Sequence, residues 1–336
     1  MVRFLIRRIV GGVVVLIVIS IITFWLFYAL PRHLHSNPAA LYAGRSPSTA
    51  TIAAVSEKLG LDKPFWTQYW EFLKGIFVGR TYGSGVTADA CHRPCLGFSF
   101  INNEPVWSEI TSDLPVDISL AIGASVIWVI TGVATGVLSA LRKATIFDRS
   151  AMTVALAGVS LPIYFTGLLS LAVFSYGPHW LRILPNVHYV GFTQNPLSWA
   201  RNLLLPWVCL AFTYAALYAR LTRGNMLETM SEDFVRTARA KGVTEERVIV
   251  RHGLRAAITP IITIFGMDLG LLLGGNVLVE QVFGFVGIGK LAIISIGSRD
   301  LPVVLGVTLF AAFFIVVANI IVDVVYAYVD PRVTYN

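Results

Sequence analysis

The chain has 336 residues, of which 56% are apolar and 13% are charged, and its mean hydropathy is +0.71. Soluble domains average about 45–50% apolar and about 25% charged residues, so this composition excludes a disordered chain, a nucleic-acid-binding arm and a typical soluble enzyme. The net charge of +7 is informative through its distribution along the chain rather than as a sign of nucleic acid binding.

Long apolar runs predict a helical membrane protein. A helix needs about 20 apolar residues to cross a bilayer, and open strands cannot cross lipid because their backbone groups stay unpaired. The first run follows Arg3, Arg7 and Arg8, but it is too long for a signal peptide and is expected to be a retained span. The fold class is therefore an all-α polytopic membrane protein with six transmembrane helices. These are predicted at 9–30, 118–141, 150–176, 203–219, 261–279 and 303–329.

Basic residues are concentrated in alternate loops. With the N-terminus inside, 15 of the 26 Lys and Arg residues fall in the four inside segments, 1–8, 142–149, 220–258 and 330–336. Because inside loops carry an excess of Lys and Arg, both termini are predicted to be cytoplasmic. The predicted organisation is 1–30 (tail and first helix), 31–114 (extracytoplasmic), 115–330 (transmembrane core with cytoplasmic loop 220–258) and 331–336 (cytoplasmic tail).

The extracytoplasmic region 31–114 is long enough for a small folded element. A turn at 59–64 precedes an amphipathic helix from Phe65, whose aromatic residues suit a membrane interface. The Gly- and Pro-rich stretch 79–105 is expected to be irregular.

A pair of cysteines lies in that stretch, as Cys91-His92-Arg93-Pro94-Cys95. A disulfide is the leading interpretation in an oxidising compartment. A zinc site would need two further ligands, of which His92 supplies at most one, and two free thiols are the remaining alternative. Cys209 lies within a predicted span and is expected to be a small packing residue.

Local signals in the loop 220–258 predict one short helix, 232–241, about 15 Å long. Ser231 is a suitable N-cap, Glu232 is spaced to pair with Arg236, and Gly242 can adopt the left-handed conformation that ends a helix. A second helix is expected to start at Thr244 and to run toward Pro260. Such a short helix must pack on something. The loop is either a solvated basic segment that sets topology or a docking surface for a cytoplasmic protein.

Residues 232–242, Glu-Asp-Phe-Val-Arg-Thr-Ala-Arg-Ala-Lys-Gly, resemble the "EAA" loop of binding-protein-dependent ABC importer permeases, in the dipeptide/oligopeptide/nickel branch. The resemblance extends over nearly the whole chain. Further matching motifs are Leu59-Gly60-Leu61-Asp62-Lys63-Pro64, Gly266-Met267-Asp268-Leu269-Gly270, Val279-Glu280-Gln281-Val282-Phe283, Arg299-Asp300-Leu301-Pro302 and Asp330-Pro331-Arg332.

The resemblance implies a type I ABC importer permease fold in a bacterial or archaeal cytoplasmic membrane. It implies that helix 232–241 couples to an ATPase. The coupling residues would be Glu232, Asp233, Phe234, Arg236, Ala238, Arg239, Ala240, Lys241 and Gly242. The implied partners are a second homologous permease, two ABC ATPase subunits and an extracytoplasmic solute-binding protein. ATP and magnesium would bind to the ATPase subunits, and this chain would bind no cofactor. The transported solute would be a di- or oligopeptide or a related small solute.

Few polar residues lie in the predicted spans. Asp268 is mid-span, where a charge is costly, so it is either a path or gate residue or a structural hydrogen-bonding group. Asn276 and Glu280 are weaker path candidates near the outer end. Gly266, Gly270 and Gly274 recur every four residues, which favours close helix packing.

Motifs for enzymatic chemistry are absent from the sequence. The stretch 284–291 has most of a nucleotide-binding P-loop but lacks its final Ser or Thr. We find no H-E-x-x-H, no G-x-S-x-G and no spaced metal ligands, so neither a catalytic nor a metal site is expected. The alternatives to a permease subunit are an ion-gradient-driven secondary transporter or channel, and a membrane-anchored enzyme or scaffold.

Overall fold

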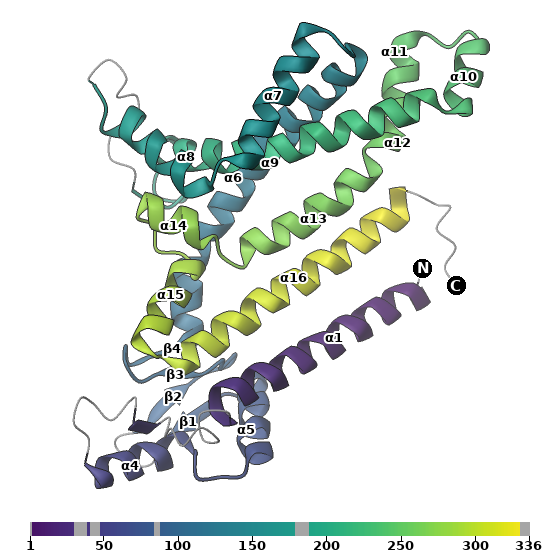
Figure 1. Ribbon diagram of the computed structural model, residues 1–336. Helices are drawn as coiled ribbons and strands as arrows, with labels where there is room; N and C mark the ends of the chain where they lie inside the picture. The colour runs from purple at the N-terminus through teal and green to yellow at the C-terminus, as the bar shows by residue number, and fades with distance from the viewer. Residues whose placement is uncertain (1, 30–38, 41–47, 84–87, 179–187, 330–336) are drawn as a thin grey trace. The chain divides into compact units, whose positions relative to one another are not determined.

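The computed structural model describes residues 2–29, 39–40, 48–83, 88–178 and 188–329 (Figure 1). The predicted tail 331–336 lies outside these residues. The chain forms two compact units. The first consists of Val116–Phe285 and the part of the last helix from Val317, and the second consists of Val2–Pro115 and Val286–Val316.

Four helices among the described residues are long and apolar enough to cross a membrane. They are α1 (Val2–Phe24), continued by the π-helical turn η1 (Trp25–Ala29), α6 (Val106–Leu141), α9 (Pro196–Ser231) and α16 (Leu301–Val329). Val106 lies twelve residues before the predicted start of its span, and α9 extends beyond 203–219 at both ends. An apolar run marks only the length of a helix that is embedded in the membrane. The helix itself can continue into more polar sequence wherever its backbone hydrogen bonds are satisfied.

Three further stretches are bent pairs, so the number of spans in the described residues is four to seven. The bends are 102° between α7 (Ile146–Ser160) and α8 with η3, 48° before α13, and 90° between α14 and α15. The other members of these bent pairs are α8 (Ile163–Ser170), η3 (Leu171–Ser175), α11 (Glu245–Arg247), η4 (Val248–Leu254), α12 (Arg255–Ala257), α13 (Thr259–Leu273), α14 (Val277–Phe283) and α15 (Ile288–Ser298).

Two predicted spans are therefore wrong as single straight helices. The run 150–176 is broken before Pro162, because proline disfavours helical geometry in the residue that precedes it. The run 261–279 stops at Leu273, where Gly274 ends the helix and Gly275 has a φ of +107°. Hydropathy is continuous across both breaks and could not mark them.

The core of the first unit is built where α6, α9 and α13 meet. Trp128, Leu210 and Tyr218 are fully or almost fully buried there, and α7 packs against α9. Gly266 of α13 lies so close to α16 that an added Cβ would be 1.7 Å from the Cγ2 atom of Val322. The glycine at this position permits the close helix packing that the sequence predicts.

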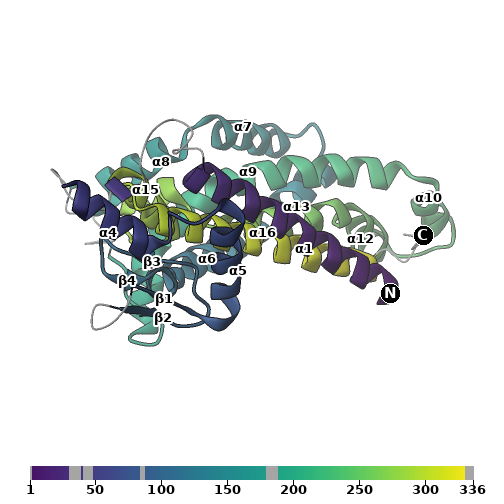
Figure 2. The same ribbon diagram turned by 90° about the horizontal axis from the view of Figure 1, so that it is seen from below.

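The second unit carries α4 (Thr49–Leu59), α5 (Phe65–Val78) and four short strands, which gather at one end of this unit (Figure 2). Strands β1 (Arg80–Tyr82) and β2 (Asp89–Cys91) pair antiparallel with Arg80 opposite Cys91. Strands β3 (Phe98–Ser99) and β4 (Glu104–Pro105) form a second antiparallel pair.

The expectation of irregular structure over 79–105 is thus wrong for these four strands and holds for the other described residues of the stretch. Strands of two or three residues are too short to leave an alternating pattern. Cys91 and Cys95 are joined by a disulfide with an S–S distance of 2.04 Å, and they are buried beside Tyr82 and Phe98. The Ser99 hydroxyl donates to the carboxylate of Asp300, the residue before α16, which ties β3 to that helix. Burial raises the pKa of Asp300 above its ordinary value.

Candidate functional site

The loop that resembles a coupling segment contains a short, well-terminated helix, α10 (Asp233–Ala240). Gly242 has a φ of +77°, its N–H donates to the carbonyl of Arg239, and the N–H of Val243 donates to the carbonyl of Ala238. These two bonds form a Schellman motif, in which a left-handed glycine satisfies the last carbonyls of a helix. The helix end predicted at Gly242 is confirmed.

Two predicted details of this helix are wrong. The N-cap is Glu232, whose carbonyl accepts from the N–H groups of Val235 and Arg236, whereas the Ser231 hydroxyl donates back to the carbonyl of Glu228 in α9. Because Ser231 belongs to the last turn of α9, it cannot cap the next helix. Arg236 pairs with Asp233 at 3.4 Å rather than with Glu232, whose backbone at the cap is extended, so that helical i, i+4 spacing does not apply to it.

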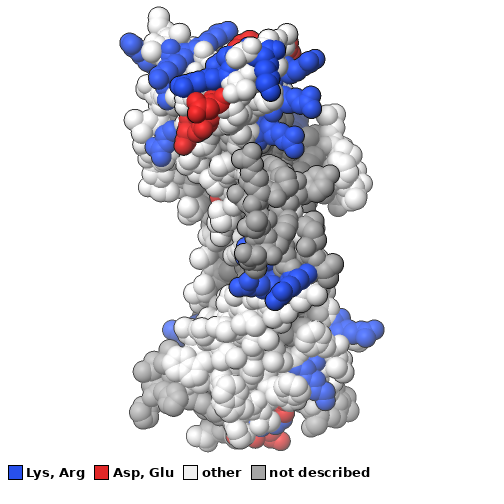
Figure 3. All heavy atoms as spheres, turned by 90° about the vertical axis from the view of Figure 1, so that its right-hand side faces the viewer, with Lys and Arg blue, Asp and Glu red and all other residues white. Residues whose placement is uncertain are grey.

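The side of α10 that faces the chain is small and apolar. Val235 and Ala238 are buried against Val248 of η4, together with Met230 of α9 and Val243. All the remaining residues of α10 are exposed, including Phe234, an aromatic ring that is 47% exposed among charged neighbours. Figure 3 shows Lys and Arg side chains gathered at the end of the molecule that carries α10 and α11.

An ion pair links α10 to the segment after the turn. The Arg239 guanidinium donates from Nε and Nη2 to the two carboxylate oxygens of Glu245, at 3.0 and 2.7 Å. This hydrogen bonding lowers the pKa of Glu245 and raises that of Arg239. Both side chains are exposed, so the pair orients the two segments but contributes little to stability.

A partly buried ion pair, in which the Asp148 side chain is 5% exposed and the Arg223 side chain 26% exposed, anchors α9 before it reaches α10. Arg223 donates from Nε and Nη2 to the carboxylate of Asp148, at 2.6 and 2.8 Å, and that carboxylate also accepts from the Ser139 hydroxyl and the N–H of Ala144. Asp148 is 3% exposed. The carboxylate therefore holds the end of α6, the start of α7 and the body of α9 together.

Sequence reasoning missed this pair. An acidic residue at the edge of a long apolar run, together with Thr145 as an N-cap whose hydroxyl accepts from the N–H of Asp148, was the available signal. The partner could not be identified because Arg223 is 75 residues away in the sequence.

Two of the three path candidates have a local structural role, and the third is buried. Asp268 of α13 accepts a hydrogen bond of 2.8 Å from the hydroxyl of Tyr218 on α9. Asn276 is the N-cap of α14 and accepts from the N–H of Val279, and Glu280 in α14 is fully buried. The break at Gly274–Gly275 separates Asp268 from the other two. Within the described part of the chain, no group of three or more His, Cys, Asp or Glu side chains could hold a metal ion.

The described residues thus combine several helices long and apolar enough to cross a membrane with one short, exposed helix between apolar segments. Residues 132–335 match the family described as binding-protein-dependent transport system inner membrane component, and residues 1–121 match the N-terminal part of such membrane components. The chain belongs to this family. It is a permease subunit of an ABC importer and not an enzyme.

Similar proteins cover the chain from end to end. A putative peptide transport system permease protein of Brucella abortus is 38% identical over 336 residues, which is 100% of both chains. The glutathione transport system permease protein GsiC of Escherichia coli strain K12 is 34% identical over 336 residues, again 100% of both chains.

Proposed function

We propose that this chain forms half of the translocation path of an ATP-driven importer for di- or oligopeptides or a related small solute. The observation that carries the proposal is end-to-end similarity to permeases named for peptide and glutathione transport. Glutathione is itself a small peptide, so both names point to the same chemical class of solute.

Coupling to ATP hydrolysis would pass through α10. A helix of this length is marginal in water, yet the Schellman motif and the packing of Val235 and Ala238 hold it in place. Its exposed residues, with Phe234 among charged side chains, are left for a groove on an ATPase subunit. The 36-residue helix α9 leads directly into α10, so movement of α10 would be transmitted along a rigid helix into the bundle.

The assembly would contain a second homologous permease, two ABC ATPase subunits and an extracytoplasmic solute-binding protein. ATP and magnesium would be bound by the ATPase subunits. The match to inner membrane transport components supports a location in a bacterial or archaeal cytoplasmic membrane. The distribution of Lys and Arg supports an orientation with both termini cytoplasmic.

Six spans are consistent with that orientation. They would be α1, α6, the bent pair α7–α8, α9, α13 with the segment before it, and α16. The pair α14–α15 would then dip into the membrane without crossing it, since its 90° bend follows two short helices.

Asp268, Asn276 and Glu280 are proposed to line the path or its gate. A carboxylate held by Tyr218 on a neighbouring span is a group whose position changes when the spans rearrange. Exchange of Asp268 for Asn, which keeps an acceptor for Tyr218, should alter solute uptake while leaving thermal stability unchanged. A parallel loss of stability would instead assign Asp268 a purely structural role.

The test of the proposed function is cross-linking and uptake in the reconstituted transporter. Phe234→Cys should cross-link to an ATPase subunit, whereas Ile146→Cys, which is exposed but lies outside α10, should not. Uptake of radiolabelled di- and oligopeptides into proteoliposomes should require ATP and survive dissipation of ion gradients by ionophores. Uptake that follows an ion gradient without ATP would favour a secondary transporter.

A further inference from the structure

Helix α5 presents three distinct faces. Gln68, Tyr69, Phe72 and Gly75 are buried against the rest of the second unit. At the spacing i, i+4, i+7 and i+11, a second face carries Trp66, Trp70, Leu73 and Phe77, which we call the aromatic stripe. The two tryptophans are 66% exposed and Phe77 is 75% exposed.

The third face carries the polar residues Thr67, Glu71 and Lys74, each one residue on from a member of the aromatic stripe, and ends at the exposed Val78. One residue rotates a helix by about 100°, so the polar and aromatic faces are adjacent but distinct. A helix whose exposed surface is divided in this way fits a boundary between an apolar and an aqueous medium.

Hydrogen bonding gives the depth of α5 relative to α1. The hydroxyls of Tyr69 and Ser20 are 2.7 Å apart and buried. The apolar segment of α1 with η1 runs from Leu5 to Ala29, and about 20 residues suffice to cross the hydrocarbon layer. If the residues of this segment beyond the first 20 all projected out of the lipid at the η1 end, the hydrocarbon layer would still extend to about residue 24. Ser20 would then lie within the layer.

Packing against α16 indicates the same depth. Tyr69 and Phe72 belong to a cluster with Leu305 and Leu309, and Leu309 is roughly 12 Å along α16 from its first residue at a rise of 1.5 Å per residue. The contacts with α1 and with α16 therefore both place the buried face of α5 within the depth of one lipid leaflet, and not beyond the ends of these two spans.

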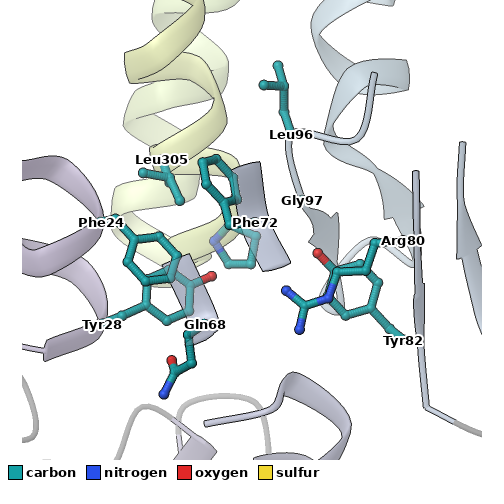
Figure 4. A pocket seen from close by; sticks show the side chains of 10 residues that line it. Phe24, Tyr28, Gln68, Phe72, Arg80, Tyr82, Leu96, Gly97 and Leu305 are labelled. Atoms are coloured by element: carbon teal, nitrogen blue, oxygen red, sulfur yellow. The ribbon is translucent and has the colours of Figure 1, made fainter. Parts of the chain in front are cut away.

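Polar contacts lie at the start of the buried face, at Gln68, and on the polar face, at Glu71. Gln68 donates to the carbonyls of Leu61 and Lys63 in the preceding turn, and Arg80 donates to Glu71 at 3.0 Å. Figure 4 shows a small hollow at this junction, with Phe72 and Leu305 near its top and Gln68 at its bottom. The junction thus changes from apolar to polar along the direction in which the spans end.

We propose that α5 lies in the membrane interface and that the aromatic stripe is inserted at the boundary between the headgroups and the acyl chains of the lipid. Tryptophan favours this position because its ring is apolar and its N–H is polar. The partner is the bilayer rather than a protein because the stripe continues the lipid-facing surface of α1. Phe65, next to Trp66, packs on Phe24 of α1. Phe24 itself is buried, but the two residues that follow it, Trp25 and Leu26, are 43% and 44% exposed, and only 17% of the apolar window of α1 is buried.

This position would fix the height of the disulfide-closed element above the membrane. The segment 79–105 follows α5 directly, so insertion of the stripe would hold β1 and β2 at a constant distance from the lipid. The inference depends neither on the identity of the solute nor on the coupling role of α10.

The test is spin-label accessibility in the transporter assembled with its partner subunits in lipid nanodiscs. Cysteines are introduced singly at Trp66, Trp70 and Phe77, in a Cys209→Ala background and without reductant. Thr67→Cys and Lys74→Cys, on the polar face of the same helix, are the matched controls. Collision rates are measured with molecular oxygen, which partitions into lipid, and with a nickel chelate, which stays in water.

Labels on the aromatic stripe should collide with oxygen about threefold or more faster than with the nickel chelate, and labels on the polar face should show the reverse preference. Addition of the solute-binding protein should leave these rates unchanged. Preference for the nickel chelate at Trp70→Cys and Phe77→Cys would overturn the proposal. Protection of the stripe from both reagents, with or without the binding protein, would overturn it in favour of a protein partner.

Discussion

Two amphipathic helices, α10 and α5, expose aromatic side chains and are used differently. In α10 the apolar side consists of two small residues buried on the chain itself, and one exposed ring, Phe234, lies among charges. In α5 the three aromatic residues of the stripe are exposed along one face, and the charges lie on a separate face. Charges around an isolated ring favour a protein groove with its own polar groups, whereas a separated apolar stripe favours lipid.

The two helices also differ in what fixes them. Backbone hydrogen bonds around a left-handed glycine and a short apolar contact define α10. By contrast, α5 is fixed by large side chains. The ring of Phe24 packs against those of Phe65, Tyr69 and Phe72, with ring-centroid distances of 5.7, 5.6 and 5.5 Å. We therefore expect single backbone changes to disable α10, and side-chain changes to have graded effects around α5.

The largest effect is expected for Gly242→Pro. Proline fixes φ near −65° and has no N–H, so it can neither adopt the left-handed conformation nor donate to Arg239. Peptide uptake should be abolished while the amount of protein in the membrane, measured by immunoblot, stays normal. Gly242→Asn is the matched control, because asparagine tolerates this conformation, and it should retain most uptake. Normal uptake by the proline variant would remove α10 from the coupling role.

Arg223→Met should have the next largest effect. It leaves the buried carboxylate of Asp148 without its charged partner, which is strongly destabilising in a protein interior. We expect the melting temperature of the purified transporter to fall by several degrees, together with lower uptake. Arg223→Lys keeps the charge but loses the bidentate hydrogen bonding to Asp148, so the fall in melting temperature should be intermediate. Equal melting temperatures for the unaltered protein and the two variants would show that the Arg223–Asp148 ion pair is not needed for stability.

A smaller effect is expected when Cys91→Ser and Cys95→Ser are combined. The disulfide closes a loop with a sequence separation of 4, so chain entropy gives it about 2 kcal/mol at most. Limited proteolysis should cleave near residues 79–105 faster in the double variant, and uptake should be reduced but not abolished. Unchanged proteolysis would mean that the packing of Tyr82 and Phe98 suffices to hold the element.

The smallest effect is expected for Glu245→Gln. The pair with Arg239 is exposed, so uptake at pH 7 should stay within about twofold of the unaltered protein. Because the pKa of Glu245 is lowered from its ordinary value of 4.5, the pair stabilises the folded loop above that pH. Its contribution is lost only as the pH falls through the lowered pKa. Between pH 6 and 8 the variant and the parent should therefore show parallel uptake profiles.

Local signals predicted the parts of the molecule that depend on short stretches of chain. The turn at 59–64, the start of α5 at Phe65, the end of α10 at Gly242 and the approximate positions of the long apolar helices follow from turn chemistry, capping and hydropathy. The errors lie where neighbours in sequence compete. Ser231 could have capped α10 but was taken into the last turn of α9 instead.

The amino-acid sequence by itself determined that this chain is a helical membrane permease component, because long apolar runs and the 232–242 motif are local and specific. Only the tertiary structure decided that 150–176 and 261–279 bend, that Asp148 meets Arg223 and Asp268 meets Tyr218, and that the buried face of α5 lies below the ends of two spans. The contacts depend on pairs of residues far apart in the chain, and the two bends lie at Pro162 and at Gly274–Gly275, inside apolar runs whose hydropathy does not change. Periodicity reports which face of a helix is apolar but not what that face contacts.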